Sequence, residues 1–489
     1  MNNKSYSLKS QVGHILLGRI IGFCCRFATP IILVRIFTKD QYGGYAQILM
    51  ISSILIPIFR FGIPNSLFYF FPRQKTQNNL NKLMSQTYFS EVFLGLLMVI
   101  ILIVFEHQII DLLHITSASA YIYYVILFLF LTLISFLLEN IFIIEEKPKI
   151  ALFYFIFDPL LRAILLISAV ITFKTVKAAV LALILFWLIK SFVLFVYLRI
   201  NYKISPLIIS MNKLKEQLKY VYPMGISILV STIGKHADKL ILALLLTTVE
   251  FAVYSVGLFS IPLIQLLYIS VGNVVLTKIS EFSLNKDNDN ALSIWKKMIL
   301  KNATVTIPVI CFFLVIAKQV IIFLFTAEYI SSVPVFRIIL LSLLVQMLGY
   351  GYILRGFGKT KKIFKANLIK MFFSIIIGLF LIKHFGIIGA ALTSTMALAI
   401  SGIIQLIYSK RTLSIRLADL LPWFDFAKLT SISLIPLTLV FFVQQLNLNN
   451  SMFIILSGLV YFPCIVILLI RCNYFSLQDI TSLKQFIKL

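Results

Sequence analysis

The sequence has little of what catalytic, metal-binding and disulfide-stabilised proteins need. Its 489 residues include only five cysteines, and none of these stands in a Cys-x-x-Cys pair or at metal-ligand spacing from a histidine. No Walker loop and no nucleophile motif is present. The expected outward loops are too short to build a membrane transferase site. We therefore predict that the protein is not an enzyme and has no catalytic residue, metal or cofactor.

Acidic residues are also scarce. Asp and Glu number 18 against 44 Lys and Arg, which gives a net charge of +26. In a soluble protein this excess would suggest nucleic-acid binding. Here 60% of the residues are hydrophobic, the mean hydropathy is +0.99, and most cations fall in the loops and tails of one side. This positive-inside pattern predicts a multi-pass membrane protein with both termini in the cytoplasm and no nucleic-acid partner.

Apolar windows between polar breaks predict an all-α polytopic membrane protein with about fourteen transmembrane helices. The expected spans are 13–37, 43–70, 84–105, 119–143, 150–172, 178–199, 221–246, 251–277, 302–325, 333–355, 363–384, 387–409, 427–445 and 452–471. The charged start leads into an arginine-bearing helix without a small-residue cleavage site, so we expect a retained first span.

The opening helix, turn and helix recur 209 residues later, where Thr38 aligns with Thr247 and Gln41 with Glu250. An internal repeat of this kind predicts two six-helix lobes around a central cavity, plus two C-terminal helices. The expected regions are an N-terminal lobe at 1–199, a cytoplasmic amphipathic linker at 200–220, a C-terminal lobe at 221–409, and two extra helices with a cytoplasmic tail at 410–489.

Several cations lie inside expected spans, although a charge in the hydrocarbon core costs free energy and usually faces a bundle interior or a wet cavity. The candidate substrate-binding cations are Arg19, Arg26, Arg60, Arg162, Lys235 and Lys370, with Lys190 and Lys239 also inside spans. Arg26, Arg60 and Lys370 have no acidic neighbour at helical spacing. Their partner must be another helix, water or an anionic ligand. The repeat places Arg26 and Lys235 at matching depths, so we expect them to face one another across the lobes.

The anions inside expected spans are Glu91, Glu139, Asp158 and Asp238. Asp158 can pair with Arg162 at i, i+4, and Asp238 with Lys235 at i, i+3. One interpretation is that these local pairs only permit insertion into the membrane. The other is that Asp158 and Asp238 tune the charge of the cavity or couple an ion to transport.

Three stretches carry a resemblance to a known family. They are RIFTKDQYGGYAQ, YPMGISILVSTIGKHADKLILALLLTTVEFAVYSVGL, and GYGYILRGFGKTKKIFKANLIKMFFSIIIGLFLIKHFGIIGAALTST. Together they resemble the bacterial polysaccharide-export flippases, the O-antigen-unit translocases of the multidrug/oligosaccharidyl-lipid/polysaccharide superfamily. The cationic first helix is also similar to that of the lipid II flippases. This resemblance implies that Arg19, Arg26 and Arg60 are cavity arginines.

The resemblance further implies alternating access around a V-shaped cavity in the bacterial cytoplasmic membrane. The implied substrate is an oligosaccharide linked to undecaprenyl pyrophosphate. We expect membrane lipids and polysaccharide polymerase machinery as further partners, and a monomer. One alternative is an ion-coupled multidrug exporter of the same superfamily, which would favour buried carboxylates. Another is a non-transporting membrane scaffold, which would leave the unpaired buried arginines unexplained.

Overall fold

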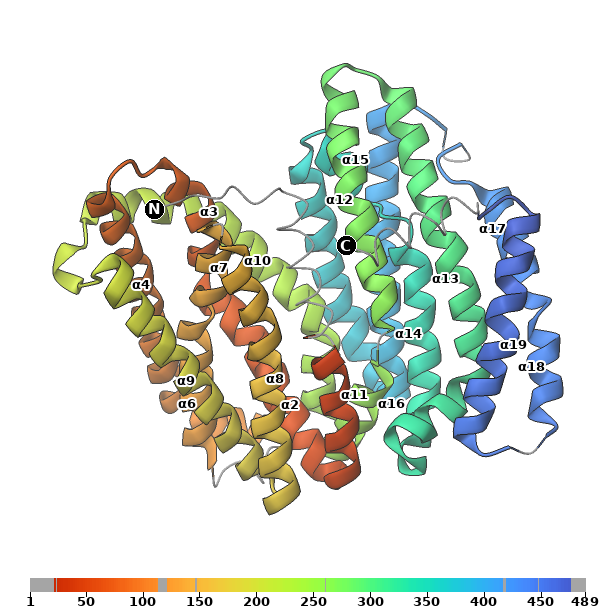
Figure 1. The fold of residues 1–489 in the computed structure, drawn as a ribbon, viewed down its shortest axis with the longest axis horizontal. Helices are drawn as coiled ribbons and strands as arrows, with labels where there is room; N and C mark the ends of the chain where they lie inside the picture. The colour runs from red at the N-terminus through yellow and green to blue at the C-terminus, as the bar shows by residue number, and fades with distance from the viewer. Residues whose placement is uncertain are drawn as a thin grey trace. The chain divides into compact units, whose positions relative to one another are not determined.

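The computed structural model describes residues 22, 24–112, 121–145, 147–259, 261–416, 419–446 and 448–475. Within these ranges the chain is helical and contains no strand, which confirms the all-α fold class (Figure 1). The α-helices are α2 Lys39–Arg60, α3 Leu67–Phe70, α4 Gln77–Val104, α5 Glu106–Leu112, α6 Ile122–Ser135, α7 Leu137–Ile144, α8 Pro148–Phe173, α9 Val176–Tyr202, α10 Met211–Leu245, α11 Thr248–Gly257, α12 Pro262–Leu284, α13 Asn288–Phe325, α14 Val333–Gln346, α15 Tyr352–Gly356, α16 Thr360–Leu413, α17 Trp423–Leu434, α18 Leu437–Gln444 and α19 Asn450–Arg471.

The chain forms two compact units, Met1–Ala252 and Val253–Leu489. In the first unit, α6 packs against α4 and α9, α8 packs against α9, and α2 packs against α10. In the second unit, α13 packs against α12, α14, α17 and α19. The helix expected to open the second lobe, α10, therefore belongs to the first unit, because its main packing partner is α2.

Ten helical segments of the described residues are long and apolar enough to cross a bilayer, and three of these join two consecutive elements, such as α6 with α7. By this measure α10 is not one of the ten. One of them, α16, has 54 residues and would be about 81 Å long if it were straight, far more than the hydrocarbon core of about 30 Å. It is bent at Gly386, whose φ of 54° and ψ of −131° are not helical and suit a glycine. The expected spans 363–384 and 387–409 meet at this residue. The total of fourteen spans remains a prediction.

The region expected as a linker at 200–220 includes the start of a long helix. α10 runs without interruption for 35 residues, so 211–220 are its first turns. Gln217 on these turns is buried, and its Nε2 donates to Ser66 Oγ at 2.7 Å and to Thr87 Oγ1 at 2.9 Å. Its Oε1 accepts from Gln86 Nε2 at 2.8 Å. These bonds fix the start of α10 to α4 and to the 3-10 helix Ile63–Ser66.

Two other expected spans also differ from the observed elements. The expected span 251–277 is divided between α11 and α12, and α12 begins at Pro262, which has no N–H to continue a preceding helix. The expected span 13–37 falls partly outside the described residues. Of its described part, residues 24–36 are helical; we call this stretch the first helix.

The two turns related by the repeat have the same local structure. Thr38 Oγ1 accepts from the backbone N–H of Gln41 at 3.3 Å, and the backbone N–H of Thr38 donates to Gln41 Oε1 at 3.1 Å. Thr247 Oγ1 accepts from the backbone N–H of Glu250 at 3.3 Å, and the backbone N–H of Thr247 donates to Glu250 Oε2 at 3.0 Å. Each pair is a capping box at the start of a helix. The residues that the 209-residue offset relates thus form the same capping box.

Candidate functional site

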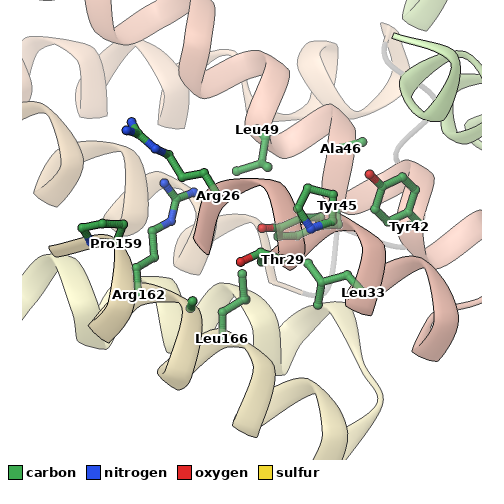
Figure 2. Close-up of a pocket in the computed structure, with 12 residues that line it drawn as sticks. Arg26, Thr29, Leu33, Tyr42, Tyr45, Ala46, Leu49, Pro159, Arg162 and Leu166 are labelled. Atoms are coloured by element: carbon green, nitrogen blue, oxygen red, sulfur yellow. The ribbon is translucent and has the colours of Figure 1, made fainter. Parts of the chain in front are cut away.

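A cavity of about 150 Å³ lies in the first unit between the first helix, α2 and α8 (Figure 2). Its lining residues are Arg26, Thr29, Pro30, Leu33, Tyr42, Tyr45, Ala46, Leu49, Pro159, Arg162, Ala163 and Leu166. Two of the predicted binding cations, Arg26 and Arg162, therefore share one cavity. We call it the arginine pocket.

A close approach of the first helix to α8 positions Arg26. A Cβ at Gly22 would lie 2.7 Å from Pro159 Cγ and 2.8 Å from the carbonyl oxygen of Phe155, so no larger residue fits there. Arg26 follows one helical turn later and lies on the same face. Its Nε donates to the carbonyl oxygen of Gly22 at 3.2 Å. This bond engages the Nε of the guanidinium group.

The arginine pocket is cationic. Among the described residues, neither Arg26 nor Arg162 forms an ion pair with a carboxylate. Figure 2 shows the two side chains projecting from the first helix and from α8 on the same side of the pocket. Two like charges in one cavity repel each other, and an anion between them would relieve this repulsion. A guanidinium group can hold phosphate oxygens through two parallel hydrogen bonds.

The rest of the lining limits what the pocket can hold. Leu33, Leu49 and Leu166 are apolar, and the Thr29 hydroxyl is already engaged, since it donates to the carbonyl oxygen of Cys25 at 2.7 Å. The volume of about 150 Å³ is below the range of roughly 300 to 1,000 Å³ that drug-sized ligands occupy. The pocket therefore suits a phosphate-sized group and is too small for a glycan.

Arg60 has a protein partner on another helix. Its Nε lies 3.3 Å from Glu91 Oε2 of α4, and the Glu91 side chain is fully buried. The guanidinium carbon also lies 4.6 Å from the centroid of the Phe136 ring. Of the three partners that the sequence left open for Arg60, which were another helix, water or an anionic ligand, the structure supplies the first.

Asp158 pairs with Lys190 of α9, and not with Arg162 one turn along its own helix. The Asp158 Oδ1 to Lys190 Nζ distance is 2.7 Å, and only 8% of the Lys190 side chain is exposed. Sequence reasoning did not place Lys190 among the site residues. Its position inside an apolar span indicated that Lys190 needs a buried partner, but the sequence could not show which carboxylate that partner would be.

The remaining predicted site residues do not line the arginine pocket. Arg19 lies outside the described residues. Lys235 and Asp238 are on α10, where Lys235 is exposed and Asp238 is buried. Lys370 is half-buried on α16 in the second unit. The structure thus brings Arg26 together with Arg162. Substrate binding by Lys235 and Lys370, and charge tuning or ion coupling by Asp238, remain predictions.

Comparisons of the sequence point to one family. The family described as polysaccharide biosynthesis protein matches residues 8–283, which is more than half of the chain. The uncharacterized membrane protein MJ1068 of Methanocaldococcus jannaschii is 28% identical over 220 residues. That match takes in 44% of this chain and 42% of the relative, so it spans less than half of the relative's length.

Solved structures share the fold. A lipid II flippase, MurJ, in an inward closed conformation matches with a TM-score of 0.69 at 18% identity, over 92% of this chain and 98% of that one. A multidrug resistance MATE family transporter of the MOP superfamily, in an inward-facing conformation, matches with a TM-score of 0.61 at 13% identity, over 83% and 98%. At these identities the likeness establishes the fold alone: this chain is folded like these two proteins.

Proposed function

We propose, because this chain belongs to the polysaccharide biosynthesis protein family, that it flips lipid-linked oligosaccharides across a membrane. The proposed substrate is an oligosaccharide on undecaprenyl pyrophosphate, such as a repeat unit of O-antigen, capsule or exopolysaccharide. The proposed location is the bacterial cytoplasmic membrane, with both termini in the cytoplasm. Membrane lipids and polysaccharide polymerase machinery are the further partners that we propose, and the protein acts as a monomer without catalysing a reaction.

The observation that carries this proposal is the arginine pocket. Arg26 and Arg162 share a cavity in which no carboxylate of the described residues neutralises either of them. Charges interact more strongly in a membrane protein interior than in water, because the effective dielectric constant is lower. A pyrophosphate is the part of a lipid-linked oligosaccharide that carries concentrated negative charge. It is also small enough for a pocket of about 150 Å³ to engage at least one of its phosphates.

The proposed mechanism divides the substrate between three environments. The polyprenyl chain stays in the bilayer, the glycan occupies hydrated space, and the pyrophosphate binds at Arg26 and Arg162. In alternating access, two lobes rock and open a binding site to each side in turn. The arginine pocket lies within the first unit, so the movement that we propose at the pyrophosphate is one of the first helix against α8. A bound ligand drives this change only if it binds one conformation more tightly than the other. We propose that the two arginines, which come from different helices, supply that difference by closing on the pyrophosphate.

A multidrug exporter would need an anionic site for organic cations. The buried carboxylate of Glu91 is paired with Arg60, and the partly exposed carboxylate of Asp158 is paired with Lys190. Among the described residues, the lining of the arginine pocket contains two cations and no carboxylate. This charge distribution favours an anionic substrate over a cationic drug.

Transport in proteoliposomes tests the proposal. The purified full chain is reconstituted with a fluorescent lipid-linked oligosaccharide, and a membrane-impermeant glycosidase is added outside. The proposal expects nearly all of the glycan to become accessible, whereas vesicles without the protein, or with Arg26→Gln/Arg162→Gln, protect the inner-leaflet half. Uptake of an organic cation such as ethidium, without any flipping of the lipid-linked glycan, would support the exporter instead.

A further inference from the structure

The spacing of Asp158 and Arg162 on α8 predicts a local ion pair. Asp158 and Arg162 are four residues apart, so their side chains lie on the same face of the helix, and this spacing favours a carboxylate–guanidinium contact. Such a contact would neutralise Arg162 at the arginine pocket. The structure shows a different pair, in which Asp158 Oδ1 lies 2.7 Å from Lys190 Nζ.

Lys190 is enclosed by aromatic rings. Its Nζ lies 4.6 Å from the Trp187 ring centroid, 5.1 Å from that of Tyr154, 5.7 Å from that of Phe136 and 5.9 Å from that of Phe186. The faces of these rings attract a cation. With 8% of its side chain exposed, Lys190 is held within the helix bundle and is a poor candidate for direct contact with a substrate.

The charges around Lys190 explain why its partner is Asp158. Glu139 of α7 also attracts the ammonium group of Lys190, and Arg162 repels it. A buried ammonium group is costly unless it is paired, and Asp158 supplies the pairing at hydrogen-bond distance. The pair therefore stabilises Lys190 and at the same time occupies the carboxylate nearest in sequence to Arg162.

We propose that Lys190 is a positioning residue that holds Asp158 away from Arg162, so that the Arg162 charge stays available to an anion in the arginine pocket. This inference rests on the proposed function, since it assumes that the pocket binds the pyrophosphate of the substrate. In the absence of Lys190, Asp158 turns to Arg162, and the pocket loses one of its two cations that no described carboxylate neutralises.

Binding of farnesyl pyrophosphate tests this inference. The affinity is measured by titration calorimetry on the full chain in lipid nanodiscs. Lys190→Met is expected to weaken binding by about 10- to 100-fold, the range that corresponds to losing one charged hydrogen-bonding group. Lys190→Met/Asp158→Asn is expected to restore native affinity, because residue 158 then carries no charge that could neutralise Arg162. A structural role of the pair would give the same rescue of stability, so affinities are compared at a temperature at which each variant is fully folded. Under that condition, only the positioning role predicts weaker binding by Lys190→Met.

A second comparison uses Arg162 itself. Arg162→Gln is expected to weaken binding as much as Lys190→Met does, and combining the two substitutions should cause no further loss. If Lys190→Met does not fold, Lys190→Gln takes its place, because the neutral amide is polar and also removes the charge that pairs with Asp158. Lys190→Arg, which keeps the pair, is the matched control and should bind as the native protein does.

These measurements distinguish the positioning role of Lys190 from anion binding by the arginine pocket. Native affinity in Lys190→Met, or weak binding in Lys190→Met/Asp158→Asn, would overturn the positioning role of Lys190. Neither result would contradict anion binding in the arginine pocket. If the native protein does not bind farnesyl pyrophosphate, or binds it equally well as Arg162→Gln, the proposed anion site is wrong and the inference falls with it.

Discussion

Gly43 of α2 lies directly against the carbonyl oxygen of Thr248: a Cβ at position 43 would stand 2.0 Å from that oxygen. Beside this contact, the Thr248 hydroxyl donates a hydrogen bond to the Asp40 carboxylate. The turn that begins α2 therefore packs on the turn that begins α11. These are the two turns that the 209-residue repeat relates, so the repeated segments meet at a contact that has no room for a side chain.

Gly43→Ala is expected to destabilise the protein strongly. The added methyl group would overlap a backbone oxygen, which cannot turn aside as a flexible side chain can, and overpacking typically costs about 1–3 kcal/mol or more. Thermal unfolding in detergent, followed by the loss of monodisperse protein, measures the effect. Gly458→Ala is the control, because the nearest atoms to its Cβ would be 3.9 Å away. Equal melting temperatures for both variants would contradict the close contact.

The two capping boxes predict matched effects. Thr38→Ala and Thr247→Ala each remove an oxygen that accepts from a backbone N–H at a helix start, which typically costs about 0.5–2 kcal/mol. Thr→Ser at either position keeps the oxygen and should be nearly neutral. Denaturant unfolding of the four variants measures these differences. A loss at one turn only would show that the turns are not equivalent.

Arg60 and Glu91 are predicted to depend on each other. Arg60→Gln leaves the fully buried Glu91 carboxylate without its cation, a loss that costs about 3–5 kcal/mol in buried pairs. Arg60→Gln/Glu91→Gln should regain most of this stability, since both charges are gone. Lys278→Gln, which breaks an exposed pair with Glu281, is the control and should cost no more than about 1 kcal/mol.

Transport by the stabilised double variant separates two roles of Arg60. If Arg60→Gln/Glu91→Gln folds and transports normally, Arg60 serves only the structure. If it folds but does not transport, the substrate contact that the family resemblance implied for Arg60 gains support. Failure of the double variant to recover stability would contradict the pairing.

α19, the last helix of the described residues, is predicted to cross the membrane. α19 has 22 residues, which is about 33 Å and enough for the hydrocarbon core. Reporter fusions after Asn449 and after Asn473 should therefore score on opposite sides, with the second in the cytoplasm. The same side for both fusions would rule out this span.

The sequence predicted the helices far better than their contacts. Helix positions follow from apolar runs and their polar breaks, and the break at Gly386 falls between two spans that were predicted separately. The start of α10 was harder, because residues 211–220 are amphipathic. The buried partners of Gln217, on α4 and at Ser66, show why these residues form the first turns of α10.

The partners of buried charges could not be predicted from the sequence either. Helical spacing suggested Asp158 with Arg162, because that pair lies within one helix, whereas the observed partner Lys190 comes from the next helix. The partner of Arg60 is likewise 31 residues away in the chain. Spacing identifies which charges are buried within a span. It does not identify which of them remain free to bind a ligand, because that depends on how neighbouring helices pack.

Export of surface polysaccharide by a flippase-deficient strain tests the arginine pocket most directly. The strain carries the native chain, Arg26→Gln, Arg26→Lys or Arg337→Gln, and membrane abundance is measured for each. Arg337 is the matched control, because its Nε, like that of Arg26, donates to a backbone carbonyl, here that of Leu314 at 3.1 Å. The pocket account predicts no export with Arg26→Gln, partial export with Arg26→Lys and native export with Arg337→Gln. Near-native export with Arg26→Gln at equal abundance would contradict it.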